Sequence, residues 1–410
     1  MEYRKIFGLI LDLGAAMIGC GGETRRVTTA VYMLAESYGF ENVNFWVVPS
    51  TVQGTVTSPD GEVFSEIRHI HGTSTDFGQL DALNSLSRKV VGEKPDAEEF
   101  AGEFAAVSVK KKRRAFITYL AGILGVIGFA GFFGCDFMDI LVVAAASLLI
   151  TFAVRRLSGR GSNPLILNLA VSMLSEFFII TCVHLGFGHH VGLITASVVM
   201  MLISGLAATN GIRDLIHLDP LSGISNITLS VTGALGIALG IAVPLYALRA
   251  WVPAEAEAAQ PGAILLLVFA VIICLGFALW FGVKGRRLAA CALGGVLMVG
   301  AYLAASSFIS SNFLCRLIAA AFCCVYSQIM ARVEKAPATI FVTIGVLPLA
   351  PGSSLYQMMH GLVSGDKALA ASGGTKLLST AFGIVMGLMI VEAGMKYVLG
   401  AAKLMKKKKR

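Results

Sequence analysis

Residues 110–134 read KKKRRAFITYLAGILGVIGFAGFFG, and this stretch decides the class of protein. Five basic residues come first, and the 20 positions of 115–134 that follow carry no charged side chain. About 20 apolar residues in a helix cross the hydrocarbon core of a bilayer, and Lys and Arg gather on the cytoplasmic side of such spans. The stretch therefore predicts a transmembrane helix that starts in the cytoplasm.

The composition extends this prediction to most of the chain. Of the 410 residues, 56% are hydrophobic and 14% are charged, whereas soluble proteins carry roughly 25% charged residues. Length and hydropathy indicate ten candidate spans, at residues 115–134, 137–154, 164–186, 190–207, 221–249, 263–283, 288–305, 307–329, 338–350 and 375–400. We therefore predict an α-helical polytopic membrane protein with ten spans.

The placement of charge predicts the orientation of these spans. Residues 1–114 hold 13 basic and 15 acidic side chains, while residues 115–410 hold 20 and 10. The basic excess thus belongs to the membrane part, where it lies in alternate loops and predicts that both termini are cytoplasmic. The runs Lys110–Arg114 and Lys406–Arg410 also suit anionic lipid. A nucleic-acid partner is not indicated, because no basic face is interleaved with aromatic residues.

The first 109 residues differ in pattern and predict a small cytoplasmic α/β domain. Residues 23–38 place apolar side chains on one helical face, and a further helix is expected after Asp76. Alternating patterns predict strands at residues 42–48, 51–57 and 62–70, the last two joined by the turn sequence Ser58-Pro59-Asp60-Gly61.

The ten spans divide into two sets of five, at residues 110–250 and 251–410. Each set has two spans, a basic linker, a third span with an internal charge and a fourth that ends in a Gly-bearing break. An odd number of spans gives the two sets opposite orientations, which is the inverted-repeat plan of many secondary transporters, with substrate bound at the interface between repeats.

The two breaks are the candidate substrate site. Pro348 and Pro351 interrupt the ninth span, because neither can donate a helical hydrogen bond, and the polar run 208–211 lies at the matching place in the first set. Broken helices are tolerated at membrane depth only where they line a cavity or are buried in protein, and a half-helix N-terminus suits a carboxylate. The candidate substrate residues are Thr209, Asn210, Gly211, Arg213, Asp214, Pro351, Gly352, Ser353, Ser354 and Tyr356. Two ordinary surface loops are the alternative.

Two charges within spans are candidates for proton coupling. Glu176 is expected near the middle of the third span and Arg316 near the middle of the eighth, and ionisable groups at such depth tend to be paired or functional. We expect them to face each other, with Glu176 accepting the coupling proton. A structural ion pair, or an Arg that reaches a lipid headgroup, is the alternative.

Other kinds of chemistry find no support in the sequence. The eight cysteines form neither a CxxC pair nor a metal-ligand spacing, so no metal site is expected. Neither a phosphate-binding Walker loop nor a Ser-His-Asp or HExxH pattern occurs, so neither a cofactor nor an enzyme activity is predicted. A membrane-embedded enzyme is therefore the weaker alternative to a transporter. The oligomeric state stays open, a homo-oligomer included.

Three motifs resemble those of the threonine/serine exporter family. They are Gly21-Gly22-Glu23-Thr24-Arg25-Arg26-Val27, Thr209-Asn210-Gly211-Ile212-Arg213-Asp214, and Pro348-Leu349-Ala350-Pro351-Gly352-Ser353-Ser354-Leu355-Tyr356. One departure is Ser204, where a proline is expected before the first-half glycine. The resemblance covers nearly the whole chain and implies a soluble N-terminal domain, ten spans, and a secondary exporter in the inner membrane of a prokaryote.

The resemblance leaves two questions open. It favours a proton-coupled exporter of serine and threonine, whereas relatives with separate halves are linked to dicarboxylates such as succinate, which are the alternative substrate. Glu23, Thr24 and Arg26 are interpreted either as a helix start with salt bridges or as the contact through which the cytoplasmic domain gates the pore.

Overall fold

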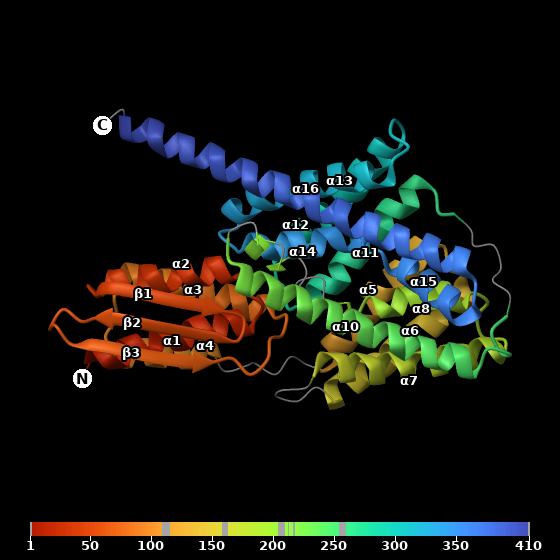
Figure 1. Ribbon diagram of the computed structural model, residues 1–410, viewed down its shortest axis with the longest axis horizontal. Helices are drawn as coiled ribbons and strands as arrows, with labels where there is room; N and C mark the ends of the chain where they lie inside the picture. The colour runs from red at the N-terminus through yellow and green to blue at the C-terminus, as the bar shows by residue number, and fades with distance from the viewer. Residues whose placement is uncertain are drawn as a thin grey trace.

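The computed structural model describes residues 2–108, 115–157, 163–203, 210–211, 213–215, 218–253 and 260–408. Its N-terminal region, residues 2–108, is a three-stranded antiparallel sheet in the order β1-β2-β3 with helices packed against it (Figure 1). The elements in chain order are α1 (Glu2–Gly19), α2 (Thr24–Ser37), β1 (Glu41–Val48), β2 (Thr51–Thr57), β3 (Val63–His69), α3 (Phe77–Glu93) and α4 (Ala97–Ser108).

The strands and helices predicted for this region are confirmed within a few residues. Residues 58–61 join β2 to β3, and Asp76 caps α3 by accepting a hydrogen bond from the Gln79 amide at 3.0 Å. The core lies between the sheet and α1, where Phe7, Leu11 and Val52 are fully buried. Hydrophobic burial of this kind is the main source of stability for a small α/β unit.

The rest of the chain is a bundle of apolar helices. They are α5 (Ala115–Phe133), α6 (Phe137–Leu157), α7 (Pro164–His184), α8 (Val191–Val199), α10 (Pro220–Ala247), α11 (Ala263–Trp280), α12 (Arg286–Ser306), α13 (Asn312–Val333), α14 (Ala338–Val346), the 3-10 turn η1 (Leu347–Leu349), α15 (Gly352–Ser364) and α16 (Lys367–Lys408). Within the described residues, eight helices are long and apolar enough to span a membrane, and the count is nine if α14 and α15, bent by 50° at their junction, form one broken span. The chain is thus a polytopic membrane protein.

Of the ten predicted spans, the fourth and the tenth differ most from the structure. The fourth, expected at 190–207, contains only the nine-residue α8 among the described residues, and residues 204–209 lie outside them. The tenth begins at Lys367 rather than 375, because Asp366 starts the helix by accepting hydrogen bonds from the amides of Ala368 and Leu369, each at 3.0 Å. An Asp at this position satisfies the first amides of a helix.

Helix packing in the bundle follows the same pattern twice. In the first half α5 packs on α6, α6 on α7, α7 on α10, and α8 on α5, α6 and α7. In the second half α11, α12, α13, α14 and α16 make the same set of pairs in the same order. The halves meet along α5 and α11, where a Cβ on Gly128 would lie 2.7 Å from the Ile273 amide nitrogen. Only glycine allows so close an approach of two backbones.

The N-terminal region is docked on one end of this bundle. The Phe77 amide donates to the Phe281 carbonyl at 2.8 Å, and the two rings meet edge to face at 5.5 Å. Arg287 pairs with Asp81, and Arg88 donates to the Lys335 carbonyl at 2.7 Å. The α11–α12 and α13–α14 loops therefore form the docking surface, and both are basic loops predicted to be cytoplasmic.

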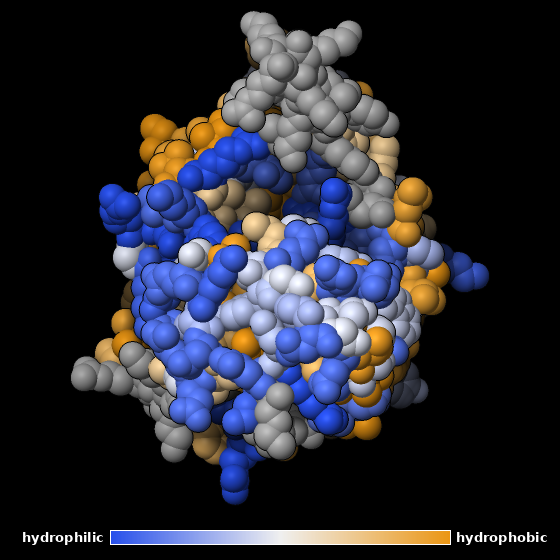
Figure 2. All heavy atoms as spheres, turned by 90° about the vertical axis from the view of Figure 1, so that its left-hand side faces the viewer, coloured by the Kyte–Doolittle hydropathy of each residue, from blue (hydrophilic) through white to orange (hydrophobic). Residues whose placement is uncertain are grey.

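The two chain ends point toward the same end of the molecule. The far end of α16 extends beyond the bundle on the side where the N-terminal region sits (Figure 1). Viewed from this side, the N-terminal region is covered largely by hydrophilic side chains, and hydrophobic ones gather on the flanks behind it (Figure 2). This distribution fits a water-exposed cap on a lipid-embedded bundle.

Candidate functional site

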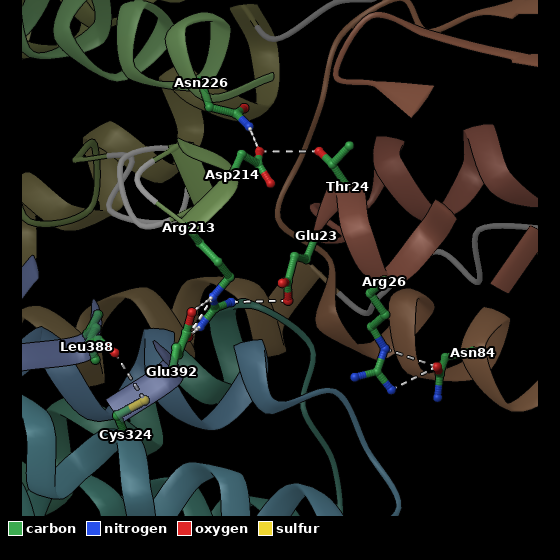
Figure 3. Close-up of polar contacts among 10 residues, drawn as sticks. All are labelled: Glu23, Thr24, Arg26, Asn84, Arg213, Asp214, Asn226, Cys324, Leu388 and Glu392. Atoms are coloured by element: carbon green, nitrogen blue, oxygen red, sulfur yellow. Dashed lines mark hydrogen bonds and ion pairs between the residues drawn. The ribbon is translucent and has the colours of Figure 1, made fainter. Parts of the chain in front are cut away.

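A buried ion cluster joins the N-terminal region to the bundle. Arg213, 4% exposed, donates through Nε to both carboxylate oxygens of Glu392 on α16, at 2.7 and 2.8 Å, and through Nη1 to Oε2 of Glu23 at 3.3 Å (Figure 3). Burial alone would lower the pKa of Arg213, but the two carboxylates outweigh it and raise the pKa. One guanidinium therefore bridges residues that lie 190 and 179 positions away in the chain.

A second set of contacts forms around the neighbouring Asp214. Thr24 Oγ1 donates to Asp214 Oδ2 at 3.3 Å, and Asn226 Nδ2, from α10, donates to the same oxygen at 3.0 Å (Figure 3). Asp214 is 1% exposed. Burial, followed by the charges of Glu23 and Asp219, raises the pKa of Asp214 to about 7 despite these two hydrogen bonds. This carboxyl group can therefore change protonation near neutral pH.

The three candidate contact residues of the N-terminal region, Glu23, Thr24 and Arg26, do not share one role. Glu23 and Thr24 reach the bundle, but Arg26 stays within the N-terminal region, where Nε and Nη2 donate to Asn84 Oδ1 at 3.2 and 3.0 Å. Burial, with a smaller contribution from Arg88, lowers the pKa of Arg26. The segment at the start of α2 is thus both a helix start and an interdomain contact.

The break in the second half lies between α14 and α15. After η1, the Gly352 amide bonds to the Ala350 carbonyl at 3.0 Å instead of continuing the helical pattern. Arg316 Nη1 donates to the Leu349 carbonyl at 2.8 Å, and its guanidinium lies over the Tyr302 ring at 5.3 Å. Arg316 therefore supplies a donor to a backbone carbonyl at the helix break.

The predicted depth of Arg316 is wrong. It lies in the second turn of α13 rather than mid-span, because α13 begins at Asn312, where the Ser311 hydroxyl caps it by accepting from the Leu314 amide at 3.5 Å. The residues before Ser311, read as part of the span, form a turn rich in serine, whose hydroxyls compete with helical hydrogen bonds.

Glu176 does lie near the middle of α7 and is fully buried. Its Oε2 accepts from Thr195 Oγ1 on α8 at 2.8 Å, and its Oε1 has no hydrogen-bond partner among the described residues. The expected pairing of Glu176 with Arg316 is also wrong, because each has a different partner on a different helix. Glu176 is therefore a buried carboxyl group without a cation among the described residues.

The start of α15 packs on α8, the helix whose Thr195 donates to Glu176. A Cβ on Gly352 would lie 3.2 Å from the carbonyl oxygen of Ala196, the residue after Thr195, and would collide with the Met200 side chain. Ser353 and Ser354 are half-buried, and Tyr356 is 3% exposed with its ring stacked on His360 at 5.7 Å. The N-terminus of a half-helix and a buried carboxyl group thus contact consecutive residues of α8.

The ten predicted substrate residues therefore fall into two places. Asn210 and Asp214 face the N-terminal region, Gly211 packs on α10, where its Cβ would lie 2.9 Å from the Gly223 carbonyl oxygen, and Arg213 belongs to the ion cluster. Residues 351–356 face α8 and α10 instead. Thr209 lies outside the described residues. Sequence reasoning missed Thr195 and Asn226, because each lies among other small polar side chains and no local pattern marks it as the partner of a charged residue.

A further polar cluster joins the α5–α6 and α7–α8 turns. Asp139, fully buried, accepts from the amides of His189 and His190 at 2.7 and 3.2 Å and pairs with His190 Nδ1 at 2.6 Å. The Asp136 carboxylate, which accepts a hydrogen bond from the His189 ring, raises the pKa of His189. Asp136, Asp139 and His189 place ligand atoms within 4.8 Å of one another, a spacing that could hold a metal ion.

Comparison with known proteins matches both halves of the chain. A family model described as "Putative threonine/serine exporter" matches residues 8–247, and one described as "Threonine/Serine exporter, ThrE" matches residues 266–393. A "Probable threonine/serine exporter" of Mycobacterium tuberculosis (strain ATCC 25618 / H37Rv) is 21% identical over 399 residues, which cover 93% of this chain and 74% of that protein. No solved structure matches. These descriptions name exporters rather than enzymes, and none names a dicarboxylate.

Proposed function

Because the chain belongs to the threonine/serine exporter family, we propose that it is a secondary-active, proton-coupled exporter of serine and threonine. The observation that carries the mechanism is the junction of α7, α8 and α15. There a buried carboxyl group, Glu176, and the start of a half-helix, Gly352, contact adjacent residues of α8. We place the transported amino acid at this junction.

The junction offers complementary groups for a zwitterion. Amides in the first turn of a helix have no helical partner, and they carry partial positive charge that suits a substrate carboxylate. Pro351 occupies the N-cap of α15, and because its ring has no hydrogen-bond acceptor, those amides have no side-chain cap. Ionised Glu176, whose Oε1 has no partner among the described residues, suits the substrate ammonium group.

Proton coupling follows if substrate and proton compete for Glu176. From the cytoplasmic side, an amino acid binds to the ionised carboxylate through its ammonium group. From the outer side, a proton neutralises the carboxylate, which removes the main attraction for the ammonium group and releases the substrate. A buried carboxylate with one hydroxyl partner and no cation nearby is held weakly in its ionised form, so both exchange steps are accessible.

The proposal includes the arrangement of the chain in the membrane. The N-terminal region, residues 1–109, is a cytoplasmic domain, because it docks on the basic loops. Residues 110–250 and 251–410 are two repeats, supported by their matching helix pairs. With five spans in each, the repeats are inverted and both termini are cytoplasmic, in the inner membrane. The basic ends of the chain contact anionic lipid.

Transport by the purified protein in liposomes tests this function. Labelled serine and threonine should enter liposomes that are acidic inside, and uptake should collapse when an ionophore removes the pH gradient. Transport of succinate in preference to either amino acid would contradict the proposed substrate.

Replacing Glu176 tests the mechanism. Glu176→Gln keeps an acceptor for Thr195 but cannot take up a proton, so uptake driven by the gradient should fall at least tenfold. The matched control is Glu36→Gln, on the exposed face of α2, which should transport like the native protein. Retained, pH-dependent uptake by Glu176→Gln would exclude Glu176 as the proton site.

A further inference from the structure

A cavity of about 80 Å³ lies between the N-terminal region and the bundle, away from the junction of α7, α8 and α15. The N-terminal region contributes Gly21, Gly22 and Thr24 and the segment 73–75, and the bundle side contributes Asn210 and Asn226. A single water needs roughly 10–15 Å³ on this measure. The cavity therefore has room for a molecule of several heavy atoms, the size of serine or threonine.

The bundle side of the cavity is rich in acceptors. Asn210 is 6% exposed, and its Oδ1 has no hydrogen-bond partner among the described residues. The Asp214 carboxylate lies directly behind two lining residues, Thr24 and Asn226, which both donate to it. A buried amide oxygen without a partner carries a desolvation penalty. A ligand that brings N–H donors, such as an ammonium group, removes that penalty.

The opposite side of the cavity is the N-terminus of a helix. The Glu23 side chain stands at the N-cap of α2 but makes no capping bond, because its carboxylate reaches Arg213 instead. The first amides of α2 are thus left for another acceptor. Gly22 lets the backbone before α2 pass close to the end of α1, since a Cβ there would lie 2.6 Å from the Met17 carbonyl oxygen. Such a site favours an anionic group, for example a carboxylate.

Hydroxyl groups complete the lining. Thr73, Ser74 and Thr75 lie in the segment before α3, which is anchored by a 2.9 Å bond from the Ser74 amide to the Gly19 carbonyl. A pocket that hydrogen-bonds a ligand hydroxyl discriminates strongly against an analogue that lacks it. Serine and threonine carry such a hydroxyl, whereas alanine and valine do not.

We propose that this interdomain cavity is a second binding site, for a hydroxyl-bearing zwitterionic amino acid, with its carboxylate at the start of α2 and its ammonium group toward Asn210 and Asp214. The choice of serine and threonine as ligands rests on the proposed function. The bound amino acid contacts both the N-terminal region and the bundle, so its binding joins the two parts.

Protection of an engineered cysteine tests the site directly. In the purified full-length protein carrying Thr75→Cys, L-threonine should slow maleimide labelling of residue 75, as followed by mass spectrometry of the labelled peptide. Ser85→Cys, exposed on α3 of the same region, is the matched control and should label at the same rate with and without threonine. L-valine and succinate should protect neither position.

A second variant tests the assignment of the ammonium group. Asp214→Asn in the Thr75→Cys background should raise the threonine concentration needed for half-protection by about tenfold or more, a loss of about 1.4 kcal/mol of binding free energy. Unchanged protection would overturn the placement of the ammonium group.

The outcomes separate this site from transport. If the Thr75→Cys protein transports threonine in liposomes but threonine does not slow labelling, the second site is excluded and the proposed function stands. If threonine protects residue 75 but is not transported, the site stands and the proposed function fails.

Discussion

Two glutamates on the membrane helices, Glu176 on α7 and Glu392 on α16, differ in what neutralises them. Arg213 binds both oxygens of Glu392 and also binds Glu23, so one guanidinium is shared by two carboxylates. Glu176 has one hydroxyl partner and one oxygen without a partner among the described residues. A buried carboxylate with a cation is fixed in its ionised form, whereas one without a cation is free to exchange its proton. On this ground we propose that Glu392 serves assembly and that Glu176 serves transport.

The largest effect on stability is expected when the cation is removed. Arg213→Ala leaves the carboxylates of Glu23 and Glu392 buried without a partner, which costs about 3–5 kcal/mol. Unfolding of the purified protein in detergent should show this loss, and the exposed neighbour variant Arg25→Ala should behave like the native protein. A loss below about 1 kcal/mol would mean that the cluster does not hold the two parts together.

A smaller loss is expected for an arginine whose partner is a carbonyl group. Arg316→Ala leaves the Leu349 carbonyl without its donor at the helix break, and a buried group without a partner costs about 1–3 kcal/mol. Arg316→Lys, which retains a donor, should lose less. Equal stabilities of the two variants would show that the guanidinium does not support the break.

Asp214 is intermediate between the two arginine cases, because Thr24 and Asn226 donate to it and no described residue provides a directly bonded cation. Burial raises its pKa to about 7, so the folded protein binds this proton more tightly than the unfolded chain does. The resulting stabilisation is complete below the ordinary pKa of an Asp and is lost as the pH rises through about 7.

Asp214→Asn should therefore flatten this part of the pH profile between pH 5 and 8, by roughly a few degrees in Tm. Glu23 and Asp219 are the neighbouring carboxylates and Arg213 the neighbouring cation, so the profile of the variant is compared with that of the native protein. Identical slopes would show that Asp214 does not titrate in this range.

The smallest effect on stability is expected for Glu176→Gln. No ion pair is broken, and the amide oxygen still accepts from Thr195, so the free energy of unfolding should change by less than about 1 kcal/mol. Loss of coupled transport with native stability would separate the two glutamates most clearly. A loss comparable to that of Arg213→Ala would place Glu176 in the structural framework instead.

Much of the fold could be predicted because its signals are local. Charge-free apolar runs indicate spans, the turn at 58–61 indicates a hairpin, and Pro348 and Pro351 indicate the break between α14 and α15. The fourth span and the depth of Arg316 were not predicted correctly. A short apolar helix and a serine-rich turn have the same hydropathy as parts of a longer span.

The candidate site could be predicted only as a set of residue types. Arg213 and Asp214 were identified from their position beside the polar run 208–211 and in the motif 209–214, but their partners Glu392 and Thr24 lie 179 and 190 positions away. Which polar side chains meet depends on how the helices pack, and a single sequence does not encode that in any local pattern. For the same reason Glu176 was expected to face Arg316 rather than Thr195.

Because α16 is long, the ion cluster can couple a tilt of this helix to the N-terminal region. The helix runs from Lys367 to Lys408 and continues past Glu392 for 16 residues. At ~1.5 Å per residue, this overhang past Glu392 is about 24 Å long. Glu392 lies where the overhang begins, and there Arg213 connects α16 to Glu23. Because Arg213 binds α16 at Glu392, the helix can pivot about this contact. A small tilt of α16 within the bilayer would then swing its overhang by several ångströms beside the N-terminal region.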